Sequence, residues 1–230
     1  MPRPRSLTDT DIARAALTVI DRDGLAALSM RSVAAQLDVS PMALYRYVEG
    51  RADVERIVAE SVLAEVEVGF GGDPEPAEQI VVLLQRVRAA VSAHPGAVPL
   101  FLAHRHQSAG SLRWIEAMLT ALTSMGFSGI GRVVAQRSLV AFLVGNLQLR
   151  LSSPLHGPGT LTLADLPSSS YPLLAETART AIDLTDDREF EAGLRALLAG
   201  LHAFASTAQA QATIPWSSAN TLRHTDAQNT

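Results

Sequence analysis

The stretch MRSVAAQLDVSPMALYRYVEGRADV, residues 30–54, decides the fold, because it contains two helix-length segments joined by a three-residue turn. Small Ala34 stands where two such helices would cross, Asp38 lies in the turn, and Leu44 is spaced as a buried anchor. Pro41 suits the first turn of the second helix, since its missing N–H would have no partner there. This order is typical of a helix-turn-helix unit, whose second helix enters the major groove of DNA.

A bracing helix precedes this hairpin in the sequence. Thr8 and Asp11 have the spacing of a capping box at its start, and Gly24 supplies its C-terminal stop. Ser29 and Ser40 stand where they can cap the next two helices. The sequence therefore predicts a compact N-terminal domain of three helices.

The helix after the turn carries side chains suited to DNA. The hydroxyls of Tyr45 and Tyr47 can reach phosphate oxygens, and Arg46 can pair with guanine through two hydrogen bonds. Met42 and Ala43 can touch a thymine methyl group. The alternative is that both tyrosines pack against neighbouring helices and that the arginine is an ordinary solvated charge.

Roughly residues 8–56 resemble the tetracycline-repressor (TetR) family of bacterial transcription regulators, and the pattern is carried by residues 15–54, AALTVIDRDGLAALSMRSVAAQLDVSPMALYRYVEGRADV. The resemblance implies that Arg31 and the helix after the turn meet base edges, while Arg51 and hydroxyl groups hold phosphates. Two departures, Asp38 at a turn position usually filled by glycine and Glu49 in a region often basic, place negative charge near DNA. The DNA-binding residues expected are Ser29, Arg31, Ser40, Pro41, Met42, Ala43, Tyr45, Arg46, Tyr47 and Arg51.

The overall charge offers DNA little general attraction. The 230 residues carry a formal net charge of −4, and residues 1–50 hold six arginines against six aspartates and glutamates. Binding must therefore depend on local placement and should weaken with salt. The chain has no cysteine, no signal-peptide pattern and no apolar run near the ~20 residues that span a bilayer. These features predict a cytoplasmic protein without a membrane partner.

The rest of the chain also has helical periodicity, and no segment alternates as a strand does. We predict an all-α protein with a helix-turn-helix domain over residues 1–52 and a helical ligand-binding and dimerisation domain over 53–207. Residues 154–169 are rich in Pro, Gly and Ser and predict a loop. The polar segment 208–230 predicts a disordered tail.

A homodimer is expected, because one helix-turn-helix reads few base pairs and palindromic operators need two copies. The segment 138–149, SLVAFLVGNLQL, is apolar nearly all round, and the last helix has one continuous apolar face. The resemblance likewise implies pairing through the last helix and the long central one, although both could instead fill a monomer core. The interface residues expected are Leu139, Phe142, Leu143, Leu194, Leu197, Leu198 and Leu201.

The helix over residues 111–126 suggests a ligand pocket. Trp114 and Met118 share one face and are typical linings of adaptable apolar cavities, while His104 and Arg105 just before could orient a polar group. We predict an apolar or amphipathic small-molecule effector here, with plain core packing as the alternative. The spacing of the histidines does not favour a metal site, and no cofactor is expected.

Together these features predict a ligand-responsive homodimeric regulator, and specifically a repressor that a small molecule releases from a palindromic operator. The fourth helix is the expected lever between ligand and DNA. A regulator or interaction module controlled by a protein partner is the alternative. An enzyme is not expected, because the sequence has no Gly-x-Ser-x-Gly, phosphate-binding glycine loop, His-Glu-x-x-His or cysteine nucleophile.

Overall fold

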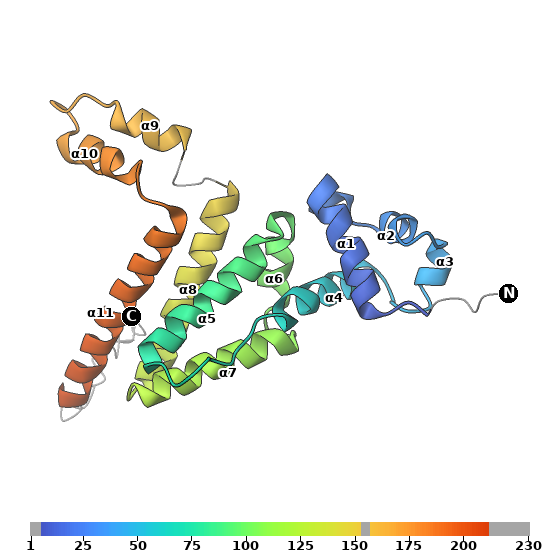
Figure 1. The fold of residues 1–230 in the computed structure, drawn as a ribbon, viewed down its shortest axis with the longest axis horizontal. Helices are drawn as coiled ribbons and strands as arrows, with labels where there is room; N and C mark the ends of the chain where they lie inside the picture. Colours follow the sequence, from blue (N-terminus) through green and yellow to red (C-terminus); the bar gives the residue numbers. More distant parts are fainter. Residues whose placement is uncertain (1–5, 153–156, 212–230) are drawn as a thin grey trace, which may run out of the picture.

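The computed structural model describes residues 6–152 and 157–211, and this part of the chain is helical without any strand (Figure 1). The all-α prediction is confirmed. In the described residues, no helix is both long enough and apolar enough to cross a membrane.

The first three helices form the small unit at the N-terminal end (Figure 1). Thr8 and Asp11 cap the first of them reciprocally, and Gly24 ends it with a positive φ of 82°, as the sequence predicts. Ser29 caps the second and Ser40 caps the third. The helices are α1 (Asp9–Asp23), α2 (Met30–Gln36) and α3 (Pro41–Leu44), with a 3-10 turn over Leu25–Ala27.

A larger bundle follows, and α8 and α11 are its longest helices (Figure 1). The helices α9 and α10 pack on each other as a hairpin that projects from the bundle. The bounds are α4 (Arg51–Ala64), α5 (Pro76–Ser92), α6 (Val98–His104), α7 (Ala109–Ser124), α8 (Gly129–Ser152), α9 (Pro158–Ala164), α10 (Pro172–Ala181) and α11 (Asp186–Gln211), with a 3-10 turn over Pro95–Ala97.

The helix α4 joins the two parts, since it packs on α1 and also on α6 and α7. Gly110 at the start of α7 lies directly against the backbone of Leu63, and its N–H donates to the Glu60 carboxylate at 3.2 and 3.3 Å. A second link runs from His94 Nδ1 to Asp21 Oδ2 of α1, at 2.8 Å. The domain boundary after residue 52 stays a prediction, because α4 is shared by both parts.

Two predictions about irregular segments differ from the structure. The predicted loop over 154–169 contains α9, because Pro158 occupies a first-turn position, where proline is tolerated rather than disruptive. The last helix continues to Gln211, past the predicted start of the tail at residue 208. The remaining part of that predicted tail, residues 212–230, lies outside the described residues.

Candidate nucleic-acid interface and effector site

The helix α3 is one turn long, so its orientation depends on contacts beyond its own hydrogen bonds. Ser40 Oγ accepts a hydrogen bond from the Ala43 N–H at 3.2 Å, and Pro41 occupies the first helical position. Leu44 is fully buried and packs into the core. The cap and this anchor together determine which side chains of α3 face outward.

The turn before α3 has the geometry of a tight helix-turn-helix corner. Asp38 adopts a left-handed conformation with φ of 56°, and its N–H donates to Ala35 O at 3.2 Å. The Val39 N–H donates a hydrogen bond to Ala34 O at 3.0 Å. Aspartate tolerates this conformation better than most residues do, so it can replace glycine here while adding an exposed carboxylate.

The outward side of α3 and of the turn after it is rich in solvent-exposed side chains. Met42 is 76% exposed, Tyr45 49% and Tyr47 39%, while Arg46 is exposed as well. Ala43 is half-buried. The two tyrosines are therefore not absorbed into the core, and their rings and hydroxyls are accessible from outside the protein.

Three further residues expected to bind DNA differ in how free their polar groups are to contact it: Ser29, Arg31 and Arg51. Arg31 is exposed, whereas Ser29 Oγ is occupied in capping α2, where it accepts from the Ser32 N–H at 3.0 Å. Arg51 Nε donates to Glu55 Oε1 at 2.7 Å. A phosphate that binds Arg51 would have to share its guanidinium with this carboxylate.

Several acidic side chains of the N-terminal unit have hydrogen-bond partners within the protein. The pKa of Asp23 is held below its usual range mainly by the hydrogen bond from Arg22, and Asp21 is bonded to His94. The pKa of Asp53 is lowered chiefly by the hydrogen bond that the Glu49 N–H donates at 2.9 Å. Of these contacts, the one with the Arg22 guanidinium also offsets the negative charge of its carboxylate partner, Asp23, which phosphates would otherwise meet.

The residues predicted for the dimer interface fall into two groups by burial, and their role in a dimer stays a prediction. The first four side chains are buried within the chain's own core and so expose little surface to a partner. An apolar helix face does not reveal whether its own chain or another one covers it. The buried set is Leu139, Leu143, Leu194 and Leu198, and the half-buried set is Phe142, Leu197 and Leu201.

A different face of α8 is exposed and apolar. Ile130 is 83% exposed, and Val133 and Val134 follow it on the next turn with about half of each side chain accessible. On α11, Phe204 is also largely exposed. The sequence could not single out these residues, because a helix that is apolar nearly all round does not reveal which side stays uncovered.

The four residues predicted for ligand binding do not line a common cavity in the described structure. Trp114 and Met118 are buried, and Trp114 Nε1 has no hydrogen-bond partner among the described residues. His104 Nε2 lies 3.9 Å from Glu55 Oε2, while Arg105 donates to a backbone carbonyl of its own helix, Leu102 O. Across the same described ranges, no cluster of three His, Asp or Glu side chains could hold a metal ion.

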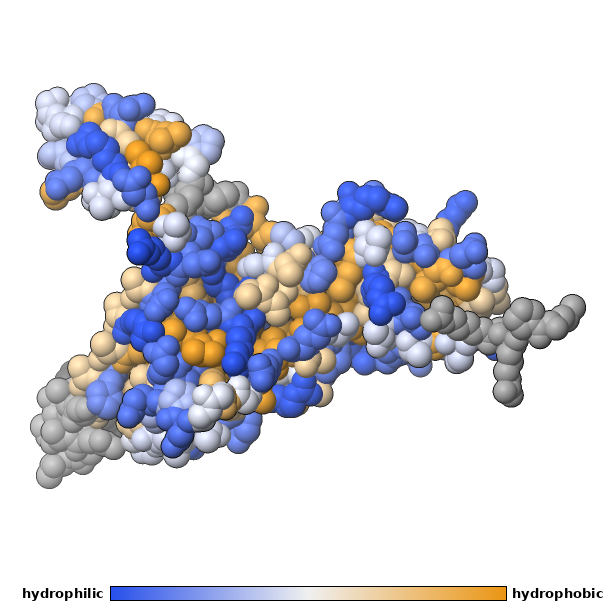
Figure 2. Space-filling view, in the orientation of Figure 1, coloured by the Kyte–Doolittle hydropathy of each residue, from blue (hydrophilic) through white to orange (hydrophobic). Residues whose placement is uncertain are grey.

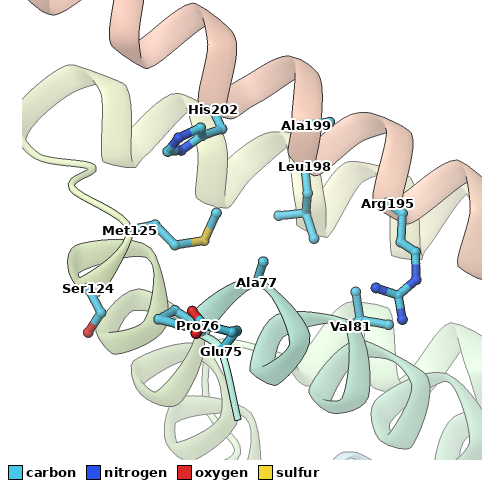
Figure 3. Close-up of a pocket in the computed structure, with 10 residues that line it drawn as sticks. All are labelled: Glu75, Pro76, Ala77, Val81, Ser124, Met125, Arg195, Leu198, Ala199 and His202. Carbon is cyan, nitrogen blue, oxygen red and sulfur yellow. The ribbon is translucent and has the colours of Figure 1, made fainter.

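A groove of about 580 Å³ lies instead between the start of α5, the end of α7 and the second half of α11 (Figure 3). Val81, Met125 and Leu198 supply its apolar lining, and the His202 ring lies above Met125 in this view. Arg195 stands at the opposite end from His202. The sequence offers no signal for this groove, because its walls come from three segments separated by tens of residues.

Comparison with known families agrees with this architecture. A family model described as "Tetracyclin repressor-like, C-terminal domain" matches residues 72–205, which run from just before α5 into α11. The chain belongs to the tetracycline-repressor family. The recognition made from residues 15–54 is thus confirmed by a different part of the chain.

Relatives of this TetR-family regulator are themselves regulators of transcription. The repressor DrrR1 of Streptomyces coeruleorubidus is 27% identical over 217 residues, which are 87% of this chain and 78% of that protein. An HTH-type transcriptional regulator of Saccharopolyspora erythraea is 27% identical over 141 residues, 61% of this chain and only 60% of that relative's length. Apo ActR from Streptomyces coelicolor is 29% identical with a TM-score of 0.75, over 90% of this chain and 100% of ActR.

Proposed function

We propose that this TetR-family regulator is a homodimeric repressor that binds a palindromic operator through α3 and is released by a small molecule. The arrangement of α3 carries the proposal: a buried Leu44 anchors a helix whose other side presents Met42, Tyr45 and Arg46 to solvent. Arginine and tyrosine on such a surface are suited to guanine edges and phosphates. The name of DrrR1 as a repressor supports the sign of regulation.

Dimerisation is supported by the uncovered apolar face of α8, with Ile130, Val133 and Val134. Contiguous exposed apolar side chains commonly mark an interaction surface. A two-fold dimer formed through this face would contain two copies of α3, and a palindromic operator requires two such helices about one helical turn of DNA apart.

Small-molecule control is supported by the structural neighbour ActR, which has been solved in complex with actinorhodin at 28% identity and a TM-score of 0.74. In this chain, α4 is the element that can carry such a signal, because it packs on both α1 and α7. A ligand that binds one orientation of α4 more tightly than another shifts the equilibrium of the dimer toward that orientation. The size of the shift equals the difference between the ligand's binding free energies for the two orientations.

Control by a protein partner is the second candidate, and the α9–α10 hairpin favours it, because apolar side chains lie on its surface (Figure 2). Leu173 is 75% exposed there, and Leu161 and Tyr171 are each about half exposed. Ligand-induced loss of operator binding separates the two readings, since a purely protein-controlled regulator would keep its DNA whatever small molecule is added.

Selection of bound duplexes from a randomised DNA pool tests the main proposal. We expect the protein to enrich a palindrome with half-sites about 34–36 Å apart. Tyr45→Ala and Arg46→Ala should fail to enrich it, while Arg188→Ala should behave like the parent, because it removes an exposed arginine on α11 instead. Enrichment by all three variants alike would refute DNA reading through α3.

A further inference from the structure

The groove between α5, α7 and α11 is lined by side chains from all three helices and is large enough for a small molecule (Figure 3). Val81, Met125 and Leu198 give it an apolar surface, while Ala77 and Ala199 have short side chains that leave room between the helices. Its volume of about 580 Å³ lies within the range of pockets that hold drug-sized ligands. Trp114 and Met118, predicted from sequence, are not among its lining residues.

Among the described residues that line the groove there is one arginine, and its charge is already paired with carboxylates of the protein. Arg195 Nη1 and Nη2 donate to both carboxylate oxygens of Glu78, at 2.8 and 3.2 Å, and its Nε donates to Glu191 at 2.9 Å. The same bonds raise the pKa of Arg195, first through Glu78 and then through Glu191. All three guanidinium nitrogens are therefore engaged with carboxylates of the protein itself.

The charges around the groove favour a cation. Three carboxylates, those of Glu75, Glu78 and Glu191, lie in or beside the groove against the one guanidinium of Arg195, so the acidic side chains outnumber the arginine by two. Glu75 lines the groove at the start of α5, and among the described residues nothing bonds its carboxylate. The C-terminal end of α7 and the N-terminal end of α5 both face the groove, so their helix dipoles oppose each other and the carboxylates decide the preferred charge.

We propose that this groove binds an amphipathic molecule with a flat apolar body and a protonated amine, and that the amine lies toward Glu75 while the body lies against Met125 and Leu198. The polarisable sulfur of methionine makes favourable contacts with aromatic rings, which suits a planar body. The assignment rests on the proposed function, since it names the class of effector. A body inserted between α5, α7 and α11 would alter how α11 lies on the bundle.

Titration of the full-length protein with a matched pair of fluorescent planar probes tests this assignment without DNA. The cation 9-(aminomethyl)anthracene should bind about tenfold or more tightly than anthracene-9-carboxylate, because the two share a flat ring system and carry an ammonium or a carboxylate at the same position. Glu75→Gln should weaken the binding of the amine by about two- to fivefold and narrow this difference. Glu176→Gln on α10 removes an equivalent exposed charge far from the groove and should change neither affinity.

Steric variants locate the probe. Ala199→Phe and Ala77→Phe fill the groove from opposite walls, and each should abolish binding of the amine while leaving the thermal unfolding curve near that of the parent. Equal or tighter binding of the carboxylate, or amine binding that survives both substitutions, would overturn the proposal. The two experiments are independent, because selection of the operator uses no fluorescent probe. If no operator were selected, the probe titration would still test the groove. If the probe did not bind, the selection would still test DNA recognition.

Discussion

Substitution of Gly110 by alanine should disturb the contact through which the bundle holds α4. An added Cβ would lie 2.5 Å from both the carbonyl carbon and oxygen of Leu63 and 2.7 Å from the backbone N of Ala64. All three atoms belong to the backbone of α4, so no side chain can rotate away. The start of α7 would have to retreat by about 0.9 Å to restore ordinary van der Waals contact, in an interior with few voids to absorb the shift.

The cost can be estimated from two opposing effects. Overpacking of this kind costs about 1–3 kcal/mol, and the shift also lengthens the hydrogen bonds from Gly110 N to Glu60, which are already 3.2 and 3.3 Å. Alanine gains up to about 1 kcal/mol over glycine in a helix interior, and less in the first turn, where this residue lies. We expect a net loss of about 1–2 kcal/mol, or roughly 2–8 °C in Tm for a chain of this size.

Gly159→Ala is the matched control, because Gly159 is also the second residue of its helix and an added Cβ there has nothing within 4 Å. Thermal unfolding monitored by circular dichroism would compare the two variants with the parent. Fluorescence anisotropy would then measure the affinity for the selected operator, which Gly110→Ala should weaken because α4 carries the DNA-binding unit. If Gly110→Ala were as stable as Gly159→Ala, the close packing of α7 on α4 would be refuted.

Three further outcomes follow from the N-terminal unit. Glu55→Gln should tighten operator binding by about two- to fivefold, because Arg51 loses the carboxylate that competes with phosphate; unchanged anisotropy titrations would contradict this. The pKa of Asp53 is lowered in the folded state, so its hydrogen bond with the Glu49 N–H stabilises the fold at neutral pH and is lost as pH falls through that pKa. Asp53→Asn should therefore make the free energy of unfolding depend less steeply on pH in the acidic range. An unchanged dependence would contradict this role of Asp53. Leu44→Ala should cost about 2–5 kcal/mol in urea unfolding, and a loss below 1 kcal/mol would contradict the anchor role.

The N-terminal unit could be predicted in detail because its rules are local. The caps at Ser29 and Ser40, the first-turn position of Pro41 and the left-handed Asp38 each depend on residues within four positions of one another. Leu44 follows from helical period alone. At these positions the propensity of the residue and the geometry of the fold agree, so short-range reasoning was sufficient.

The uncovered apolar face of α8 could not be predicted from the same kind of pattern. Leu139 and Leu194 lie on strongly apolar faces, but the neighbouring helices of the same chain cover them completely. Hydrophobic periodicity predicts that one face of a helix is buried, but it does not indicate whether the same chain or another chain covers that face. Only the packed bundle separates those residues from Ile130 and Val133, whose apolar side chains remain uncovered.

The groove depends on still longer-range information. Ala77, Met125 and Ala199 become neighbours only when three helices pack, and none of them carries a sequence signal of its own. Arg195 taken alone would suggest an anion site, and only its contacts with Glu78 and Glu191 reverse that expectation. The charge of the ligand that a site prefers therefore depends on which of its charged side chains are already paired within the protein. A TetR-family sequence can reveal the residues of a ligand site and still suggest a ligand of the wrong charge, because it does not show these pairs.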